Sequence, residues 1–351
     1  MNERQTTILG FATLILVLAT IWLLFGESGE QQPKAPRLLF PGLVERGAEL
    51  GAVTIARAEQ SVELERRGDT WVVANRGDYP AQEDKIARLI TGLARAERLA
   101  EKTARADRFS RIGLGEEALL VTLATNTGQD VAALAIGDTA EGPRQARFVR
   151  RPDEAAAWTA SGLPAVTADP GDWIDPEIFD MDRERIARID VTPPDAPAYT
   201  LVREETGGPF QLTDQAEAET LKAFGGADRI ATALAFMNAE DVRPIDQTPP
   251  GDPWRITVTA FNGFTLYARL WPDEAGPWIG LAAGEGGGAP AAEVDGDDGE
   301  QEAIPAAPDP LDRAEDLNAR WDGWLYRLPP FKGDDLTQQR SDLLEEAESD
   351  E

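Results

Sequence analysis

The chain of 351 residues contains no histidine and no cysteine. Histidine is the usual general base near neutral pH and the commonest metal ligand. Its absence excludes Ser-His-Asp triads, Cys-His pairs, zinc sites with His ligands and His-based phosphorelays. The absence of cysteine excludes disulfides, thiolate metal sites and cysteine nucleophiles. Carboxylate chemistry, a Ser-Lys pair or an arginine clamp would remain, but the chain has only five lysines. These absences predict a protein that is not an enzyme and has no catalytic, cofactor-binding or metal-binding residues to assign.

Positive charge is also scarce. The chain has 34 Lys and Arg against 63 Asp and Glu, which gives a net charge of −29. Such a chain repels the phosphates of nucleic acid, and the same charge argues against docking on anionic lipid headgroups. An apolar fraction of 42% and nine tryptophans supply enough material for packed cores. The composition therefore predicts a globular protein that does not bind nucleic acid.

A long apolar run occurs only at the N-terminus, where residues 8–25 read ILGFATLILVLATIWLLF and carry no charge. Eighteen helical residues span about 27 Å, close to the hydrocarbon thickness of a bilayer. A cleaved signal peptide is the alternative, but no Ala-x-Ala site follows the run. The run predicts a retained anchor, with residues 1–7 in the cytoplasm. The flanking basic residues do not decide the orientation. The N-terminal position favours a single-pass protein of a bacterial inner membrane with the bulk of the chain in the periplasm.

After a polar linker at residues 26–37, the chain repeats one plan twice, at a period of about 140 residues. Hydrophobic alternation and turn residues mark each strand, and spacings of three and four mark each helix. The first unit, residues 38–180, contains a strand at 51–55, a hairpin at 61–73, a helix at 82–99, a hairpin at 119–136 and a short strand at 146–150. The second unit, residues 181–335, contains a strand at 186–191, a hairpin at 199–212, a helix that carries Ile230, Leu234 and Met237, a hairpin at 254–271 and a short strand at 324–328.

This order predicts an α+β fold: two tandem units of antiparallel sheet, each covered by one helix. Residues 283–316 interrupt the second unit with glycines, Ala-Pro steps and acids, so we expect a disordered insertion there. Residues 336–351 form an acidic C-terminal tail. Both acidic segments are either binding segments for a partner or solubilising segments, and the second interpretation is favoured.

Short segments in a fixed order carry a family resemblance. They are LLFPGL at 38–43, WVV at 71–73, YPA at 79–81 before an amphipathic helix, DWI at 172–174, and WLYRLP at 324–329 followed by Phe331 and Leu336. Together they resemble the bacterial DUF4340 family, a domain of unknown function, over residues 38–344. The resemblance implies a single-anchor envelope protein found with components of ABC-type transport systems of the gliding-motility auxiliary kind. It brings no catalytic signature to any residue here, and the insertion departs from the family's compact pattern.

Two motifs in the insertion match binding signatures only in part. GEGGGA at 284–289 has the spelling of a dinucleotide fingerprint, but Pro290 and a run of acids follow it instead of a helix. Asp295, Asp297 and Asp298 suggest a calcium loop. An EF-hand that starts at Asp295 needs Gly at its sixth position and Glu at its twelfth, where this chain has Glu300 and Ala306. Neither motif predicts a site.

Paired carboxylates could hydrolyse glycosides without histidine. The candidates near aromatic residues are Asp172 and Asp175 beside Trp173, and Glu240 with Asp241. Turn, cap and solvated helix-end roles explain these acids equally well. Five tryptophans of the second unit could bind sugars, but tryptophan in alternating strands is more often packed in a core, and Trp278 is the best candidate for exposure. The others are Trp254, Trp271, Trp321 and Trp324.

The sequence thus favours a non-enzymatic, membrane-anchored envelope protein. We expect an accessory or scaffold subunit that contacts a membrane protein complex, with ABC-type transporter subunits as the suspected partners. The alternative is a cell-wall or polysaccharide-binding module, with a carboxylate-dependent glycosidase as its catalytic form.

Overall fold

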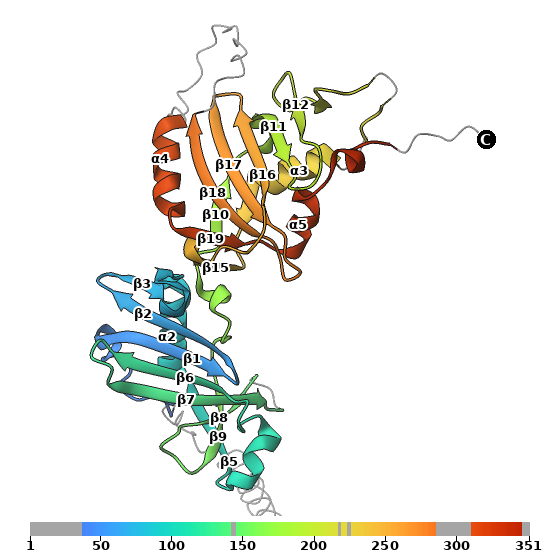
Figure 1. The fold of residues 1–351 in the computed structure, drawn as a ribbon. Helices are drawn as coiled ribbons and strands as arrows, with labels where there is room; N and C mark the ends of the chain where they lie inside the picture. Colours follow the sequence, from blue (N-terminus) through green and yellow to red (C-terminus); the bar gives the residue numbers. More distant parts are fainter. Residues whose placement is uncertain (1–36, 142–144, 217–218, 223–225, 286–309, 346–351) are drawn as a thin grey trace, which may run out of the picture.

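The structure is a computed structural model, which describes residues 37–141, 145–216, 219–222, 226–285 and 310–345 (Figure 1). The anchor predicted at residues 8–25, the linker as far as residue 36, the two motifs of the insertion beyond Glu285 and the last six residues lie outside the described part. Within that part, no helix is long and apolar enough to cross a membrane.

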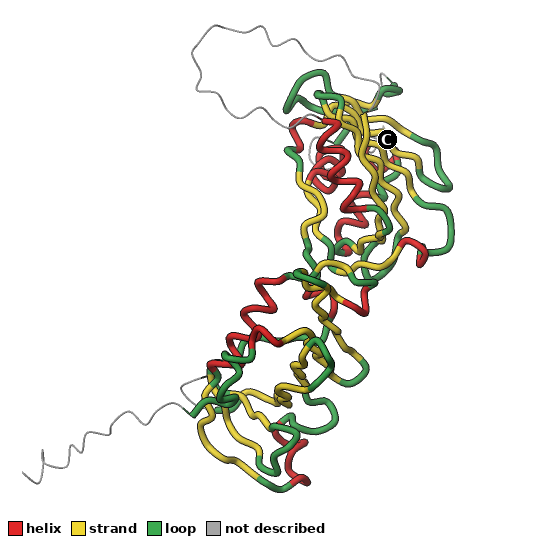
Figure 2. The backbone as a smooth tube through the Cα atoms, turned by 90° about the vertical axis from the view of Figure 1, so that its left-hand side faces the viewer, coloured by secondary structure: helices red, strands yellow, loops and turns green. Residues whose placement is uncertain are grey.

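Two antiparallel sheets in tandem, with a few helices packed on them, make an α+β fold. Figures 1 and 2 show the two sheets with their helices following each other end to end. We call residues 37–175 the first unit and residues 176–345 the second unit. The predicted boundary lay after Asp180, but strand β10 (Glu177–Asp180) pairs with β14 (Phe236–Asn238), so β10 is counted in the second unit.

The first unit is a nine-stranded sheet with the order β4-β3-β2-β1-β6-β7-β8-β9-β5. Its strands are β1 Leu50–Arg57, β2 Gln60–Arg67, β3 Thr70–Val73, β4 Tyr79–Pro80, β5 Glu97–Thr103, β6 Leu119–Thr125, β7 Asp130–Thr139, β8 Arg147–Arg150 and β9 Ala157–Ser161. Helix α2 (Glu83–Arg95) buries Ile86, Leu89 and Leu93 because the spacing places them on one face. The 3-10 helices are η1 Gly47–Glu49, η2 Ala74–Arg76, η3 Ala106–Ile112 and η4 Pro170–Trp173.

The second unit is an eight-stranded sheet with the order β13-β12-β11-β16-β17-β18-β19-β15. Its strands are β11 Ile186–Thr192, β12 Tyr199–Val202, β13 Gln211–Leu212, β15 Asp241–Pro244, β16 Trp254–Ala260, β17 Phe264–Trp271, β18 Trp278–Glu285 and β19 Trp324–Arg327. Its helices are α3 Gly226–Ala235, α4 Pro310–Trp321 and α5 Pro330–Leu336, with the 3-10 helices η5 Arg183–Arg185, η6 Ile245–Gln247 and η7 Arg340–Leu343.

The two sheets share one plan. Reading from β3 to β5 and from β13 to β15 gives the same succession of strands, position by position. The pairing register also shifts at the same place in both sheets, between Leu50 and Ala52 in β1 and between Ile186 and Arg188 in β11. Such bulges bend a strand at a defined position. The shared order and the shared bulge give each strand from β3 to β5 of the first sheet an equivalent strand in the second, and β4 has none.

The strand-by-strand equivalence of the two sheets corrects one predicted match. The structure also contains strands and helices that were not predicted. The strand at 324–328 was matched with 146–150, but β18 occupies the place of β8, and β19 occupies that of β9. The helix predicted at 82–99 ends at Arg95, and β5 begins at Glu97. The second unit carries three helices instead of the one expected. Strands β5, β9, β15 and β18 were not predicted, because their sequences lack clear apolar alternation. Helix α4 was not predicted because its first turns lie in the segment predicted to be a disordered insertion, although Ala314, Leu317 and Trp321 stand at helical spacing.

Parts of the predicted disordered insertion and of the predicted acidic tail are ordered. Strand β18 continues to Glu285 and α4 begins at Pro310, so the edges of the predicted insertion are ordered. In the predicted tail, Leu336 and Leu343 are fully buried. Burial of these two leucines anchors residues 336–345 to the second unit.

Candidate functional site

The four acids singled out from the sequence lie in segments that meet at the junction of the two units. Asp172 and Asp175 belong to the connecting segment that includes η4. Glu240 and Asp241 lie where β15 begins. Sequence reasoning selected these acids because aromatic residues stand nearby in the chain. The structure brings them together because the connection packs against both units at once.

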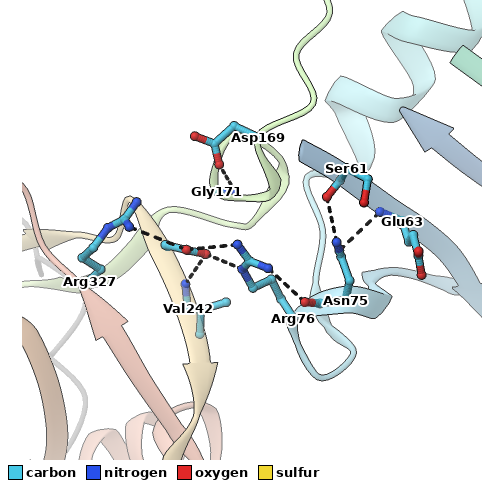
Figure 3. A network of polar contacts seen from close by, with 9 residues as sticks. Ser61, Glu63, Asn75, Arg76, Asp169, Gly171, Val242 and Arg327 are labelled. Carbon is cyan, nitrogen blue, oxygen red and sulfur yellow. Dashed lines mark hydrogen bonds and ion pairs between the residues drawn. The ribbon is translucent and has the colours of Figure 1, made fainter. Parts of the chain in front are cut away.

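Asp241 forms the central ion pair of the junction. Its side chain is 10% exposed and receives two hydrogen bonds from Arg76 of η2, at 2.7 and 3.2 Å. The backbone N–H of Val242 donates to the same carboxylate at 2.9 Å, and Arg327 Nη1 lies 3.9 Å away. Figure 3 shows Arg76 and Arg327 approaching this carboxylate from opposite sides. A bidentate guanidinium–carboxylate pair fixes geometry as well as charge, so it holds η2 of the first unit against β15 of the second.

η2 is itself held in place by its middle residue, Asn75. The Asn75 side chain donates to the carbonyl of Ser61 at 2.8 Å and accepts from the backbone N–H of Glu63 at 3.3 Å. These bonds tie η2 to the edge of β2, so Arg76 projects from a positioned turn. Arg76 could not be singled out from the sequence, because a single arginine in a short turn matches no motif.

Aromatic rings make the apolar part of the junction. Tyr79 of β4 lies edge to face with Trp324 and Tyr326 of β19, with ring centroids 5.0 and 6.0 Å apart. Burial raises the pKa of both tyrosines above its ordinary value. Gly77 adopts a left-handed φ of +70°, and a Cβ there would lie 2.8 Å from Pro244 Cγ. The close approach of the two units at this turn therefore needs glycine.

The connecting segment is packed against the first unit. Trp173 is fully buried, and its Nε1 donates to Thr167 O at 3.1 Å. Its carbonyl accepts from the backbone N–H of Gln82 at 2.8 Å, while the ammonium of Lys85 donates to the carbonyl of Asp172 and lies 5.0 Å from the Trp173 ring centroid. On the other side, a Cβ on Gly171 would lie 1.9 Å from Glu240 O. The segment is therefore a tight spacer with neighbours in both units.

These contacts define what the junction acids can do. Asp241 is held by Arg76, and Asp175 forms an ion pair with Arg320 at 3.0 Å. Asp172 and Glu240 are exposed, and their backbones are bonded to the junction. Glycoside hydrolysis needs one carboxylic acid and one carboxylate facing a common substrate. The contacts of Asp241 and Asp175 instead join structural elements.

Trp278 is not exposed, so that prediction is wrong. It retains 8% of its surface and packs with Trp271 and Leu325 in a small cluster on the outer face of the second sheet. The guanidinium of Arg243 lies 3.8 Å from its ring centroid. Trp254, Trp271 and Trp321 are buried as well, which confirms the core interpretation for these tryptophans.

A cleft of about 930 Å³ lies on the first unit, where η3 faces β7 and β8. Six charged residues line it, and no ion pair joins any two of them: Arg57, Arg147, Arg150, Glu116, Glu117 and Asp138. Arg147 donates to Gly137 O instead, and Arg150 lies over the ring of Phe109. The sequence did not indicate this cleft, because its walls come from five separate segments.

Metal ligation has no candidate in the described part of the chain, where no three of the acids come together in a group that could hold an ion. Of the fingerprint at 284–289, only Gly284 and Glu285 are described, and they end strand β18. The aspartates of the calcium-like loop lie outside the described residues.

A family model described as a domain of unknown function (DUF4340) matches residues 71–253. The matched range is shorter than the resemblance at 38–344. It begins in β3 of the first unit and ends just before β16 of the second, so it contains η2, the connecting segment and β15 of the junction but not β19. Neither a curated protein nor a solved structure matches the chain.

Proposed function

We propose that this chain, which belongs to the DUF4340 family, is a non-enzymatic accessory or scaffold subunit of an ABC-type transport system of the gliding-motility auxiliary kind. Residues 8–25 anchor it in a bacterial inner membrane, and the two units stand in the periplasm. The nature of the transport system follows from the family resemblance.

The observation that carries the proposal is that the residues of the junction join the two units to each other. The acids and aromatic residues that could have formed a catalytic centre between the units join them instead, through the Arg76–Asp241 pair and the packing of Tyr79 on β19. A body of two firmly joined sheets presents fixed surfaces to partners, which is what a scaffold requires.

Crosslinking in intact cells, followed by detergent extraction and mass spectrometry, tests the proposal. We expect permease or ATPase subunits of an ABC-type transporter to co-purify with the full chain. A chain exported with a cleavable signal in place of residues 8–25 is the matched control, and we expect it to recover these subunits much less. Recovery of no membrane subunit with the full chain contradicts the proposal.

The alternative function, a polysaccharide-binding module or a carboxylate-dependent glycosidase, retains one supporting observation. The buried position of Trp278 removes the exposed ring that suggested sugar binding. The cleft on the first unit remains large enough for a small ligand. Binding of cell-wall fragments by the body cut after residue 32, with loss of binding in Arg57→Ala, would favour this alternative. A body that ignores glycans would eliminate it.

A further inference from the structure

The outer face of the second sheet carries two arginines directly opposite each other. Arg255 in β16 and Arg269 in β17 are paired residues of the antiparallel ladder, and both side chains are exposed. Tyr267 lies two residues before Arg269 on the same face and is 44% exposed. In the neighbouring strand β18, Ala282 pairs with Tyr267 and Gly280 pairs with Arg269, so a small residue stands beside each of these two side chains. We call Arg255, Tyr267 and Arg269 the arginine platform.

Neither arginine of the platform has a polar partner in the described part of the chain. Among the residues that the structure describes, no hydrogen bond, ion pair or ring contact involves Arg255 or Arg269. Like charges at directly opposed positions of a sheet are destabilising. Another arginine of the same face does have an acidic partner: Arg188 forms a two-point ion pair with Asp190 at 2.6 and 2.7 Å. Residues 176–351 contain 38 Asp and Glu against 14 Lys and Arg, yet none of the acids that the structure describes forms an ion pair with either arginine of the platform.

The first unit shows that the fold does not require these arginines. Its equivalent ladder positions hold Leu120 opposite Ala135, and Ala133 stands where the second unit has Tyr267. Phe109 and Ile112 of η3 pack over Ala135 and cover part of that face. In the second unit, the short connection at residues 245–253 takes the place of this covering segment. The outer face of the second sheet is therefore open at the position where the first unit closes it.

We infer that the arginine platform is the docking surface for an extended acidic segment of a partner protein, with two carboxylates placed to meet Arg255 and Arg269. The guanidinium fork matches a carboxylate in a two-point hydrogen bond. Arginine and tyrosine are also the residue types that most often dominate binding energy at protein interfaces. This inference rests on the proposed function, because it assigns the surface through which a subunit of the membrane complex would be held.

The charge of the second unit restricts the partner further. A densely charged polyanion would be repelled by the excess of 24 negative charges in residues 176–351. Charges are screened beyond about 8 Å at physiological salt, so isolated carboxylates near the platform respond mainly to the two arginines. A protein segment with spaced Asp or Glu side chains meets this condition, and nucleic acid does not.

The test is photo-crosslinking in intact cells with the full chain, in which p-benzoylphenylalanine replaces Ala282, the exposed neighbour of Tyr267. We expect an adduct whose crosslinked peptide lies in a segment with at least two Asp or Glu residues of another protein. The double variant Arg255→Glu/Arg269→Glu should reduce that adduct at least tenfold. Replacement of two partner acids by arginine should restore it in the double variant.

The matched control is Arg88→Glu/Arg95→Glu, which makes the same charge change at two exposed arginines of α2, and we expect the adduct to persist there. An adduct that survives reversal of the platform overturns the inference, as does an adduct with this chain itself, with glycan only, or with nothing. If ABC-type subunits still co-purify with the platform variant, the inference fails and the proposed function stands. If these subunits co-purify with neither the unmodified full chain nor the platform variant, the proposed function fails too.

Discussion

The two units have the same strand order and the same bulge, yet they differ in charge and in the treatment of their outer faces. Residues 37–175 hold 18 Lys and Arg against 22 Asp and Glu, a net charge of −4, while residues 176–351 hold 14 against 38, a net charge of −24. The first sheet covers part of its outer face with η3, and the second leaves arginines there. The comparison shows that this fold depends on its inner faces and leaves the outer faces free to diverge.

The largest expected effect comes from Trp321→Ala in the second unit. Trp321 is 2% exposed, packs on Phe179 and donates to Ile178 O at 2.9 Å. Its removal should lower the free energy of unfolding by about 4 kcal/mol. Helix α4 lies between β18 and β19 of the second unit, and the first unit has no helix between the equivalent strands β8 and β9. Hydrogen exchange should therefore accelerate in the second unit and stay slow in the first. Equal acceleration in both units would show that they unfold together.

Asp241→Ala should come next, because it leaves Arg76 and Arg327 without their carboxylate. We expect the free energy of unfolding to fall by about 2 kcal/mol. The two units should then give separate transitions in calorimetry. Asp190→Ala breaks a more exposed pair with Arg188 and should cost less than about 1 kcal/mol. Similar losses in the two variants would mean that the Arg76–Asp241 pair does not couple the units.

Gly77→Ala tests the close approach of the units against a matched turn. Gly77 and Gly68 both have left-handed φ values, +70° and +64°, but only Gly77 faces the other unit. Backbone strain should destabilise both alanine variants by about 1 kcal/mol. Contact with Pro244 should add about 1 kcal/mol more for Gly77→Ala, measured by urea denaturation. Equal losses would contradict the tight packing at this turn.

High pH should weaken the second unit more than the first. Burial raises the pKa of Tyr199 and Tyr326 in the second unit and of Tyr79 in the first. Above pH 10 the unfolded chain loses protons that the native tyrosines keep, so stability falls as pH rises, by up to about 1.4 kcal/mol per pH unit for each tyrosine. The lowered pKa of Lys332 acts in the opposite direction only below pH 10.5.

Urea denaturation between pH 10.5 and 11.5 therefore isolates the tyrosine contribution. Tyr199→Phe should flatten the pH dependence because it removes one buried phenol of the second unit. A slope that is identical in the wild type and in this variant would show that Tyr199 does not hold its proton in the native state.

Arg269→Thr should give the smallest effect, and its sign is informative. Removal of the like-charge contact with Arg255 should raise the free energy of unfolding by about 0.5 kcal/mol. Arg188→Thr on the same face should lower it, because Asp190 loses its partner. Loss of stability in Arg269→Thr would mean that the platform serves the fold, which would contradict a binding role.

Much of the fold follows from local patterns. The hairpin predicted at 61–73 corresponds to β2 and β3, and Gly68 supplies the positive φ at its turn. Strands β5 and β15 could not be predicted, because each pairs with a strand distant in sequence and lacks a regular apolar face of its own. The acids of the candidate site were recognised individually. Arg76, which gives Asp241 its role, was not, because only the docking of two units places it there.

By itself, the sequence determined which chemistry is impossible and which fold class results. The absence of His and Cys excludes their chemistry whatever structure the chain adopts. Apolar periodicity specifies strands and helices through contacts between near neighbours in the chain. The tertiary structure decided that Asp241 is paired, that Trp278 is buried and that Arg255 faces Arg269. The first two outcomes depend on contacts between segments far apart in the chain, which no local pattern encodes. The third depends on the exact register of the predicted hairpin at 254–271.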